Sequence, residues 1–335
     1  MAKTVELILA QPGMHRMKSR SIMLSQAFIY HWSSPLQGTL SPLLEGYQFG
    51  LQAGDIESAG WNLFFRCEHS YYNGYQLDGL QHEFQTAVDV LSQLKLESHR
   101  LLMLQILYNV KKLQGLDIEE GDVVPTDLLS IAAETNDPNL RASVLVGQLE
   151  MCVFFNEWES AVTVLLDAGD LRSSATVGRF LEIRFTVLEA LISLKAAQSA
   201  TAFLEKRKWK KRGVKSMKLI RRWVKAGNVN IVHSLHLLSA ELAVLKRNDT
   251  KAEESFKSAI SVTAKTGVLQ DKGLAHELAG AYFDNRGDEY WAKYHTESSQ
   301  EAYTDWGASA KVEQLTRKCL KWTRLSAHPW EDPKD

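Results

Sequence analysis

Residues 234–259, SLHLLSAELAVLKRNDTKAEESFKSA, decide the fold. Apolar residues recur at helical spacing on both sides of a break at Arg247-Asn248-Asp249. They are Leu235, Leu238, Leu242 and Leu245 before the break, and Ala252, Phe256 and Ala259 after it. Residues 277–292, ELAGAYFDNRGDEYWA, repeat the arrangement, since Ala292 follows Ala252 by 40 positions. The two stretches predict consecutive helical hairpins with the same internal spacing over residues 231–322.

Small residues occupy matching places in the two hairpins: Ala240 and Gly280 in the first helix, Ala252 and Ala292 in the second. This spacing resembles the tetratricopeptide repeat, in which small residues let the paired helices approach closely. The 40-residue interval exceeds the roughly 34 residues of that repeat, so the resemblance implies tetratricopeptide-like units. It implies a packing role for Ala240, Ala252, Phe256, Ala259, Ala279, Gly280, Phe283, Ala292, Trp306 and Gly307.

Three runs carry a second resemblance: AEL at 240–242, ELAG at 277–280 and YTDWGASAKV at 303–312. They resemble the helical-repeat region of large signalling proteins. Those proteins join this region to a protein-kinase-like module, an ATPase of the STAND or AAA type, and GAF and histidine-kinase modules. The sequence has no motif of those catalytic modules. The resemblance therefore implies an adaptor in a kinase or ATPase pathway, with such a protein as its partner, or a piece split from a larger signalling protein.

Helical periodicity continues through the earlier part of the chain, without strand-like alternation. The sequence therefore predicts an all-α fold, a tetratricopeptide-like solenoid in which antiparallel helix pairs stack into a superhelix. The expected segments are an N-terminal tail (1–13), N-terminal repeats (14–114), a loop (115–125), middle repeats (126–205), a basic connecting segment and helix (206–230), the C-terminal repeats (231–322) and a C-terminal tail (323–335).

A superhelix of hairpins has a concave groove lined by the first helix of each pair. The repeat register predicts that Glu241, Leu245, Glu277, Asp284 and Asn285 face this groove, together with Ser234 and Leu237. The lining is acidic, so we expect a basic or apolar peptide partner; the alternative is that these carboxylates are only solvated. The aromatic residues Tyr290, Trp291, Tyr294, Tyr303 and Trp306 are expected to fill hairpin interfaces rather than to form a ligand cage.

Residues 206–222 contain ten Lys or Arg residues and no acidic residue. One hypothesis is a solvated connection between hairpins followed by a basic helix face that acidic residues elsewhere balance. The other is a functional segment: a nuclear-import signal, a phosphate-contacting patch, or a basic amphipathic helix around Trp209, Met217, Leu219, Ile220 and Trp223. On this hypothesis the chain would be a nuclear or nucleic-acid-associated regulatory factor. The patch begins with Lys206, Arg207, Lys208, Lys210, Lys211 and Arg212.

Other features indicate a non-enzymatic cytoplasmic protein without a cofactor. The net charge is −1, and the three cysteines are too far apart to pair as metal ligands. No run of about 18 apolar residues predicts a membrane span, and residues 1–20 do not fit a secretory signal. His233 and His236 lie on adjacent turns of one helix but have no third ligand at a metal-binding spacing. We therefore predict no metal site and no catalytic residues.

Overall fold

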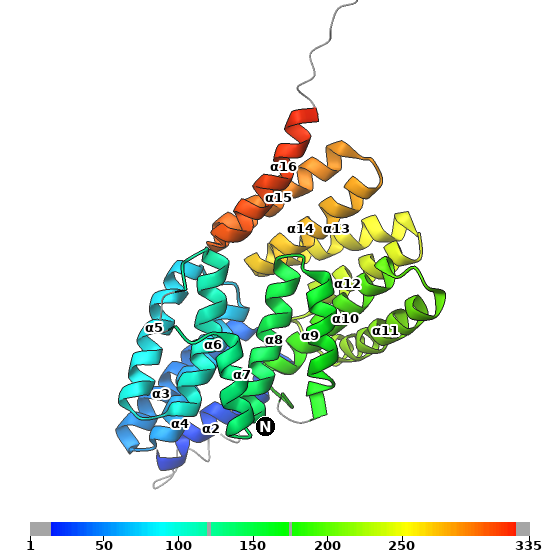
Figure 1. Ribbon diagram of the computed structural model, residues 1–335. Helices are drawn as coiled ribbons and strands as arrows, with labels where there is room; N and C mark the ends of the chain where they lie inside the picture. The colour runs from blue at the N-terminus through cyan, green and yellow to red at the C-terminus, as the bar shows by residue number, and fades with distance from the viewer. Residues whose placement is uncertain (1–14, 119–121, 174–175, 326–335) are drawn as a thin grey trace, which may run out of the picture.

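The computed structural model describes residues 15–118, 122–173 and 176–325, and these are helical without a β-strand. The all-α prediction is confirmed (Figure 1). The elements are α2 (His15–Phe28), η1 (Tyr30–Trp32), η2 (Leu36–Thr39), α3 (Leu40–Ala53), α4 (Ile56–Tyr72), α5 (Leu77–Gln93), α6 (Glu97–Gln114), α7 (Pro125–Glu134), α8 (Pro138–Phe154), α9 (Trp158–Ala168), η3 (Leu171–Ser173), α10 (Phe180–Ser199), α11 (Phe203–Lys225), α12 (Val232–Leu245), α13 (Asp249–Thr266), α14 (Leu269–Asn285), α15 (Glu289–Trp306) and α16 (Ser309–Leu325).

Polar N-caps and left-handed turns separate the helices. Asp55, Asn248 and Asp288 each accept a hydrogen bond from a backbone N–H in the first turn of α4, α13 and α15. Gly307 ends α15 with a φ of 90°, a left-handed conformation that glycine adopts without steric strain. The chain therefore reverses within a few residues, and consecutive helices can pack side by side.

Adjacent helices pack in pairs, among them α3–α4, α5–α6, α10–α11, α12–α13 and α14–α15. Backbones approach closely in two of these pairs. A Cβ at Gly280 would lie 3.3 Å from the carbonyl oxygen of Ala292, and one at Gly213 would lie 3.2 Å from that of Ala190. Larger side chains at these positions would push the paired helices apart.

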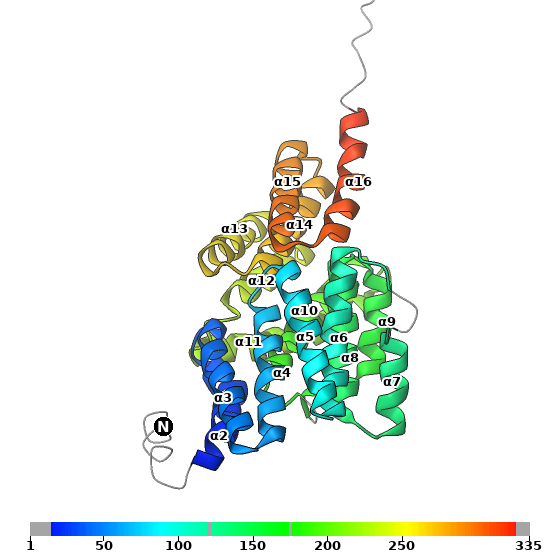
Figure 2. The same cartoon turned by 90° about the vertical axis from the view of Figure 1, so that its left-hand side faces the viewer.

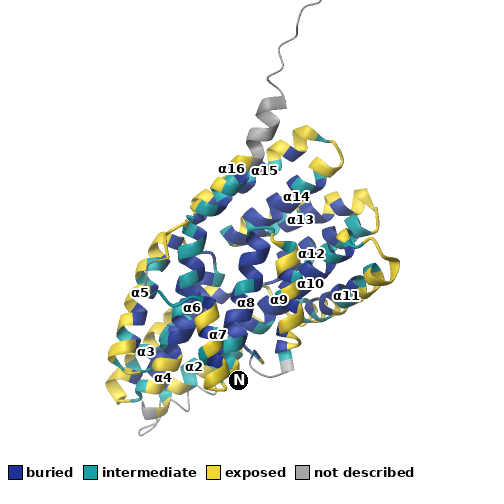
Figure 3. Cartoon of the chain, viewed as in Figure 1, coloured by how far each residue is buried: buried dark blue, intermediate teal, exposed yellow. Residues whose placement is uncertain are grey.

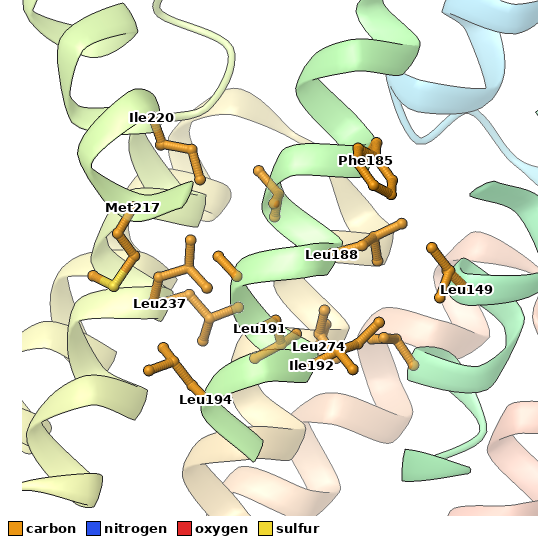
Figure 4. Close-up of a cluster of buried hydrophobic side chains, with 14 of the residues drawn as sticks. Leu149, Phe185, Leu188, Leu191, Ile192, Leu194, Met217, Ile220, Leu237 and Leu274 are labelled. Carbon is orange, nitrogen blue, oxygen red and sulfur yellow. The ribbon is translucent and has the colours of Figure 1, made fainter. Parts of the chain in front are cut away.

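Helix α10 lies at the centre of the larger core. Its residues are buried along most of the helix, from Phe180 to Leu194. Figure 4 shows α10 side chains directed toward α11 at Met217 and Ile220, and toward Leu149 of α8 and Leu274 of α14. In Figure 3, α8 and α10 are mostly dark blue, whereas α5 and α11 carry yellow outer sides. A helix that is apolar all round is typical of such a central position.

The C-terminal helices return to the N-terminal half. Helix α16 packs against α6, and Figure 2 shows its lower end above α6. Gln76 donates a hydrogen bond to the carbonyl oxygen of Asp305, 3.2 Å away. The Trp306 ring is fully buried beside Phe154 and Tyr71, with ring-centroid distances of 5.3 and 6.3 Å. These contacts join α15 and α16 to α4, α5, α6 and α8.

The expected segment boundaries differ from the helix ends at one important place. Residues 206–222 lie within α11, which begins at Phe203 and runs without a break to Lys225. The basic run is therefore not a connection between hairpins but the second helix of the α10–α11 pair. The expected tails, 1–13 and most of 323–335, and residues 119–121 of the expected loop lie outside the described residues.

Candidate functional site

The two glutamates that were expected in an open groove lie inside the molecule. Glu241 is 1% exposed and contacts Lys195 Nζ at 2.8 Å, and Gln198 Nε2 donates to its other oxygen. Glu277 is 4% exposed and contacts Lys311 Nζ at 2.7 Å. Ion pairing offsets the desolvation of these carboxylates. The prediction of an acidic groove lining is therefore corrected: both carboxylates join helices internally.

The other residues expected at the groove are not brought together with them. Leu245 is half-buried, whereas Asp284 and Asn285 are exposed at the end of α14. The Asn285 side chain donates to the carbonyl oxygen of Ala281 in its own helix. Ser234 and Leu237 are buried. This set of residues therefore forms no common surface.

The expected packing residues are mostly buried. Those with at most 2% exposure are Ala240, Ala252, Phe256, Ala259, Ala279, Ala292 and Trp306; Gly280 is buried, and Phe283 and Gly307 are half-buried. The aromatic cluster divides into two parts. Tyr303 and Trp306 are fully buried, but Tyr290, Trp291 and Tyr294 are 73%, 43% and 47% exposed. Trp291 and Tyr294 still contact the rings of Phe283 and His276 in the paired helix α14, with centroid distances of 6.1 and 6.5 Å, so these two cover the edge of the hairpin interface.

Helix α11 has one buried face and one strongly basic face. Trp209, Gly213, Ser216, Met217 and Ile220 are buried. We define the basic face of α11 by its exposed cationic residues: Arg207, Lys208, Lys211, Lys215, Lys218, Arg221, Arg222 and Lys225. From Arg207 to Lys225 the face extends about 27 Å, at 1.5 Å per residue.

The basic face is not neutralised by the rest of the fold. Arg212, at its edge, pairs with Glu189 at 2.9 Å. In the part of the chain that the structure describes, none of the eight residues of the basic face has an ion-pair partner. Among the described residues, Arg212 is balanced by its ion pair with Glu189, and Lys215 is attracted by the nearby charge of Asp170. Phe203 and Leu204, at the start of the helix, are 74% and 76% exposed.

A second candidate is a cavity of about 340 Å³ where the segment before α3 meets α4, α10, α12 and the turn between α13 and α14. We call it the junction cavity. One wall is apolar and includes Leu36, Phe180, Ile183, Val187 and Ile231. The polar residues of the lining are Gln37, Asn73, Arg184, Asn230, His233, Ser234, Lys265, Thr266 and Asp271. Tyr72, which has both an aromatic ring and a hydroxyl group, also lines the cavity.

A buried charge network forms the floor of the junction cavity. Arg184 Nε donates to Glu150 Oε1 at 2.5 Å and Nη1 donates to Asp271 Oδ1 at 3.1 Å. The other oxygen of Asp271 lies 2.7 Å from His233 Nε2. Burial raises the pKa of Glu150, because the charge of Arg184 only partly compensates the lost hydration. Burial alone would raise the pKa of Asp271 too, but the charges of Arg184 and His233 outweigh it and hold that pKa well below its ordinary value.

Sequence reasoning found the basic run but missed the junction cavity. Arg184 and Asp271 lie 87 positions apart, and the lining comes from several separate segments. The available signal was a charged residue inside an otherwise apolar helix, as in FLEIRFTVLEALI at 180–192. A charge in such a position must find a buried partner.

No grouping of three or more His, Cys, Asp or Glu side chains suited to a metal ion occurs among the described residues. No described helix has the length and hydropathy needed to cross a membrane. Comparison with known proteins gives no significant match to a protein-family model, to a curated protein or to a solved structure.

Proposed function

We propose that this chain is a non-enzymatic interaction module built as a tetratricopeptide-like array of helical hairpins. The close approach of Gly280 to Ala292 supports the repeat architecture, because small residues meet at the two positions where the resemblance expects them. In such an array, the rigid helix pairs present a fixed surface to a partner.

The basic face of α11 is the binding surface in this proposal. The observation that carries it is eight exposed cationic residues on one helix face, none of which has an acidic neighbour at ion-pair distance within the described part of the chain. The opposite face, including Met217 and Ile220, is buried against the core, so the helix is held in place before a partner arrives. Uncompensated charges of one sign attract a partner of the opposite sign and set its orientation.

The partner is an acidic segment of another protein. Cations clustered along one helix suit nucleic acid as well as an acidic protein segment, so the charge alone does not choose between the two partners. Trp209, inside the basic run, is 6% exposed and is not available to stack on a base. Phe203 and Leu204 are exposed at the start of the same helix and offer an apolar anchor of the kind found in protein interfaces.

The signalling role follows from the resemblance of residues 240–242, 277–280 and 303–312 to the helical region of kinase and ATPase signalling proteins. Since this sequence has no motif of those catalytic modules, the chain would act on a kinase or ATPase by binding it as a separate protein. Affinity purification of the tagged chain from its own cells, followed by mass spectrometry, tests this role. The expected result is a kinase, ATPase or histidine-kinase partner that is lost when the basic face is neutralised. Recovery of import factors or nucleic acid would instead favour the nuclear alternative.

A direct test uses fluorescence anisotropy with a labelled Glu-rich peptide and a labelled 20-base-pair DNA duplex. The variant Lys211→Glu, Lys215→Glu, Lys218→Glu reverses three charges of the basic face. The control variant Lys246→Glu, Lys251→Glu, Lys257→Glu makes the same charge change at exposed sites of α12 and α13. We expect the unaltered chain and the control to bind the peptide, and the α11 variant to bind it at least about tenfold more weakly.

Two outcomes would overturn the proposal. Equal loss of binding in both variants would show a response to net charge rather than to the basic face. Tighter binding of the duplex than of the peptide, with an affinity that falls steeply as salt rises, would assign the face to nucleic acid.

A further inference from the structure

Several polar groups of the junction cavity have no hydrogen-bond partner in the described protein. His233 Nδ1 is buried and unpaired, and the His233 residue is 4% exposed. Arg184 uses Nε and Nη1 for its two carboxylates, which leaves Nη2 without an acceptor among the described residues. The hydroxyls of Ser234 and Tyr72 likewise make no hydrogen bond to that part of the chain, although both residues line the cavity. A buried polar atom without a partner, as His233 Nδ1 is, costs free energy, and the other groups remain available to a molecule in the cavity.

These groups are mainly hydrogen-bond donors. Arg184 Nη2 donates only, and the Ser234 and Tyr72 hydroxyls can donate. The Asp271 carboxylate can only accept, so His233 Nε2 carries the proton in their 2.7 Å contact. Lys265 adds an ammonium group at the cavity, is exposed, and has no ion-pair partner in the described residues. An anionic oxygen satisfies more of these groups than a neutral ligand does.

The apolar wall limits the rest of the ligand. Phe180, Ile183 and Val187 of α10 give the cavity an apolar wall. The volume of about 340 Å³ lies at the low end of the range for small-molecule sites, roughly 300–1,000 Å³. A short hydrocarbon body fits this wall, whereas a large cofactor exceeds the space.

We propose that the junction cavity binds a small monocarboxylic acid with an apolar body. Its carboxylate accepts from Arg184 Nη2 and Ser234 Oγ and lies near Lys265, while the hydrocarbon packs on Phe180, Ile183 and Val187. This site is separate from the basic face of α11, and its binding does not depend on a protein partner.

The charged groups around the site are Asp271 of α14, Arg184 of α10 with its partner Glu150 of α8, and Lys265 of α13. Arg184 is shared between the two carboxylates, whereas Lys265 has no ion-pair partner among the described residues. Lys265 is therefore the cation that is available to a bound carboxylate.

Isothermal titration calorimetry of the full chain with octanoate, and with 1-octanol as the neutral analogue, tests the proposal. We expect octanoate to bind at least about tenfold more tightly than 1-octanol, since only the carboxylate uses the charged donors.

Substitutions locate the ligand. Ser234→Ala and Lys265→Ala should each weaken octanoate binding several-fold, and Val187→Phe should abolish it by filling the cavity. The matched control is Lys257→Ala, which removes an exposed lysine of the same helix outside the cavity and should leave binding unchanged. Ser234→Ala and Lys265→Ala keep the test valid if Val187→Phe does not fold, because one is nearly isosteric and the other is at the surface. Equal affinity for acid and alcohol, or octanoate binding that neither substitution weakens, would overturn the proposal.

Discussion

Glu277 Oε1 lies 2.7 Å from Lys311 Nζ, and this ion pair joins α14 to α16 inside the molecule. Both side chains are at most 4% exposed, and Tyr303 donates to the second oxygen of Glu277 at 3.1 Å. Removal of one partner leaves the other charge buried, so Glu277→Gln or Lys311→Met should lower the free energy of unfolding by about 3–5 kcal/mol. Urea-induced unfolding measures this loss. The double variant Glu277→Gln, Lys311→Met should lose less than the sum of the single losses; simple additivity would contradict a direct pair.

Gly280 tests the close approach of α14 to α15. A Cβ at this position would lie 2.9 Å from Thr296 Oγ1 and 3.3 Å from the Ala292 carbonyl oxygen. Although alanine has the higher helix propensity, Gly280→Ala should lower the free energy of unfolding by about 1–2 kcal/mol because the helices must separate.

The matched control for Gly280 is Gly79 in α5, where an added Cβ would have no heavy atom within 4 Å. Gly79→Ala should raise the free energy of unfolding by about 0.5–1 kcal/mol through helix propensity alone. Thermal unfolding of the two variants side by side measures the difference in sign. Stabilisation by both substitutions would mean that α14 and α15 can move apart freely.

His31 makes stability depend on pH in mildly acidic solution. It is fully buried, and burial lowers its pKa to about 4, whereas an unfolded histidine titrates near 6.5. Between these values the unfolded chain binds a proton that the native chain does not, so stability falls as the pH decreases from 6.5 and levels off below about 4. The loss over this window is roughly 3 kcal/mol at 1.36 kcal/mol per pKa unit.

The substitution His31→Phe isolates this contribution. The phenyl ring keeps the aromatic contacts with Phe180 and Trp32 but cannot be protonated. Urea unfolding at several pH values between 4 and 7 should therefore show a smaller slope than in the unaltered chain. Some slope should remain in the variant, since burial and the neighbouring Arg179 still lower the pKa of His69. An unchanged slope would show that groups other than His31 cause the loss of stability in acid.

The repeat spacing was sufficient to predict the helices but not which charged residues they bury. Helical periodicity treats a carboxylate as outward-facing, so Glu241 and Glu277 were expected in a groove. Their partners, Lys195 and Lys311, lie 46 and 34 positions away in other helices. Whether such a charge is solvated or paired depends on tertiary packing, which a local pattern does not contain.

The basic run shows the opposite case. Trp209, Met217 and Ile220 recur at helical spacing within it and are all buried, so the sequence did contain the signal for one continuous amphipathic helix. One interpretation of the run, a basic amphipathic helix around these apolar residues, used this signal. The junction cavity had no comparable signal, because its lining comes from segments between Pro35 and Asp271.

Asn230 fastens the turn between α11 and α12 to the segment before α3. Its Oδ1 accepts from the Leu36 backbone N–H at 2.9 Å, and its Nδ2 donates to the carbonyl oxygens of His31 and Ser34 at 2.7 and 2.9 Å. Asn230→Ala removes three hydrogen bonds and should lower the free energy of unfolding by about 2–3 kcal/mol. Asn285→Ala, which removes one exposed bond to its own helix, should change it by less than about 0.5 kcal/mol.

The substitution Asn230→Asp distinguishes the hydrogen bond that Asn230 accepts from the two that it donates. The carboxylate still accepts from the Leu36 N–H, but it can no longer donate to the two carbonyl oxygens and repels them. Hydrogen exchange read at the Leu36 amide should therefore be fast in Asn230→Ala and remain slow in Asn230→Asp, although both variants are less stable. Because Leu36 and Asn230 both line the junction cavity, octanoate binding should weaken in both variants as this edge of the cavity loosens. Slow exchange at Leu36 in both would mean that this amide is protected by the surrounding packing and not by Asn230.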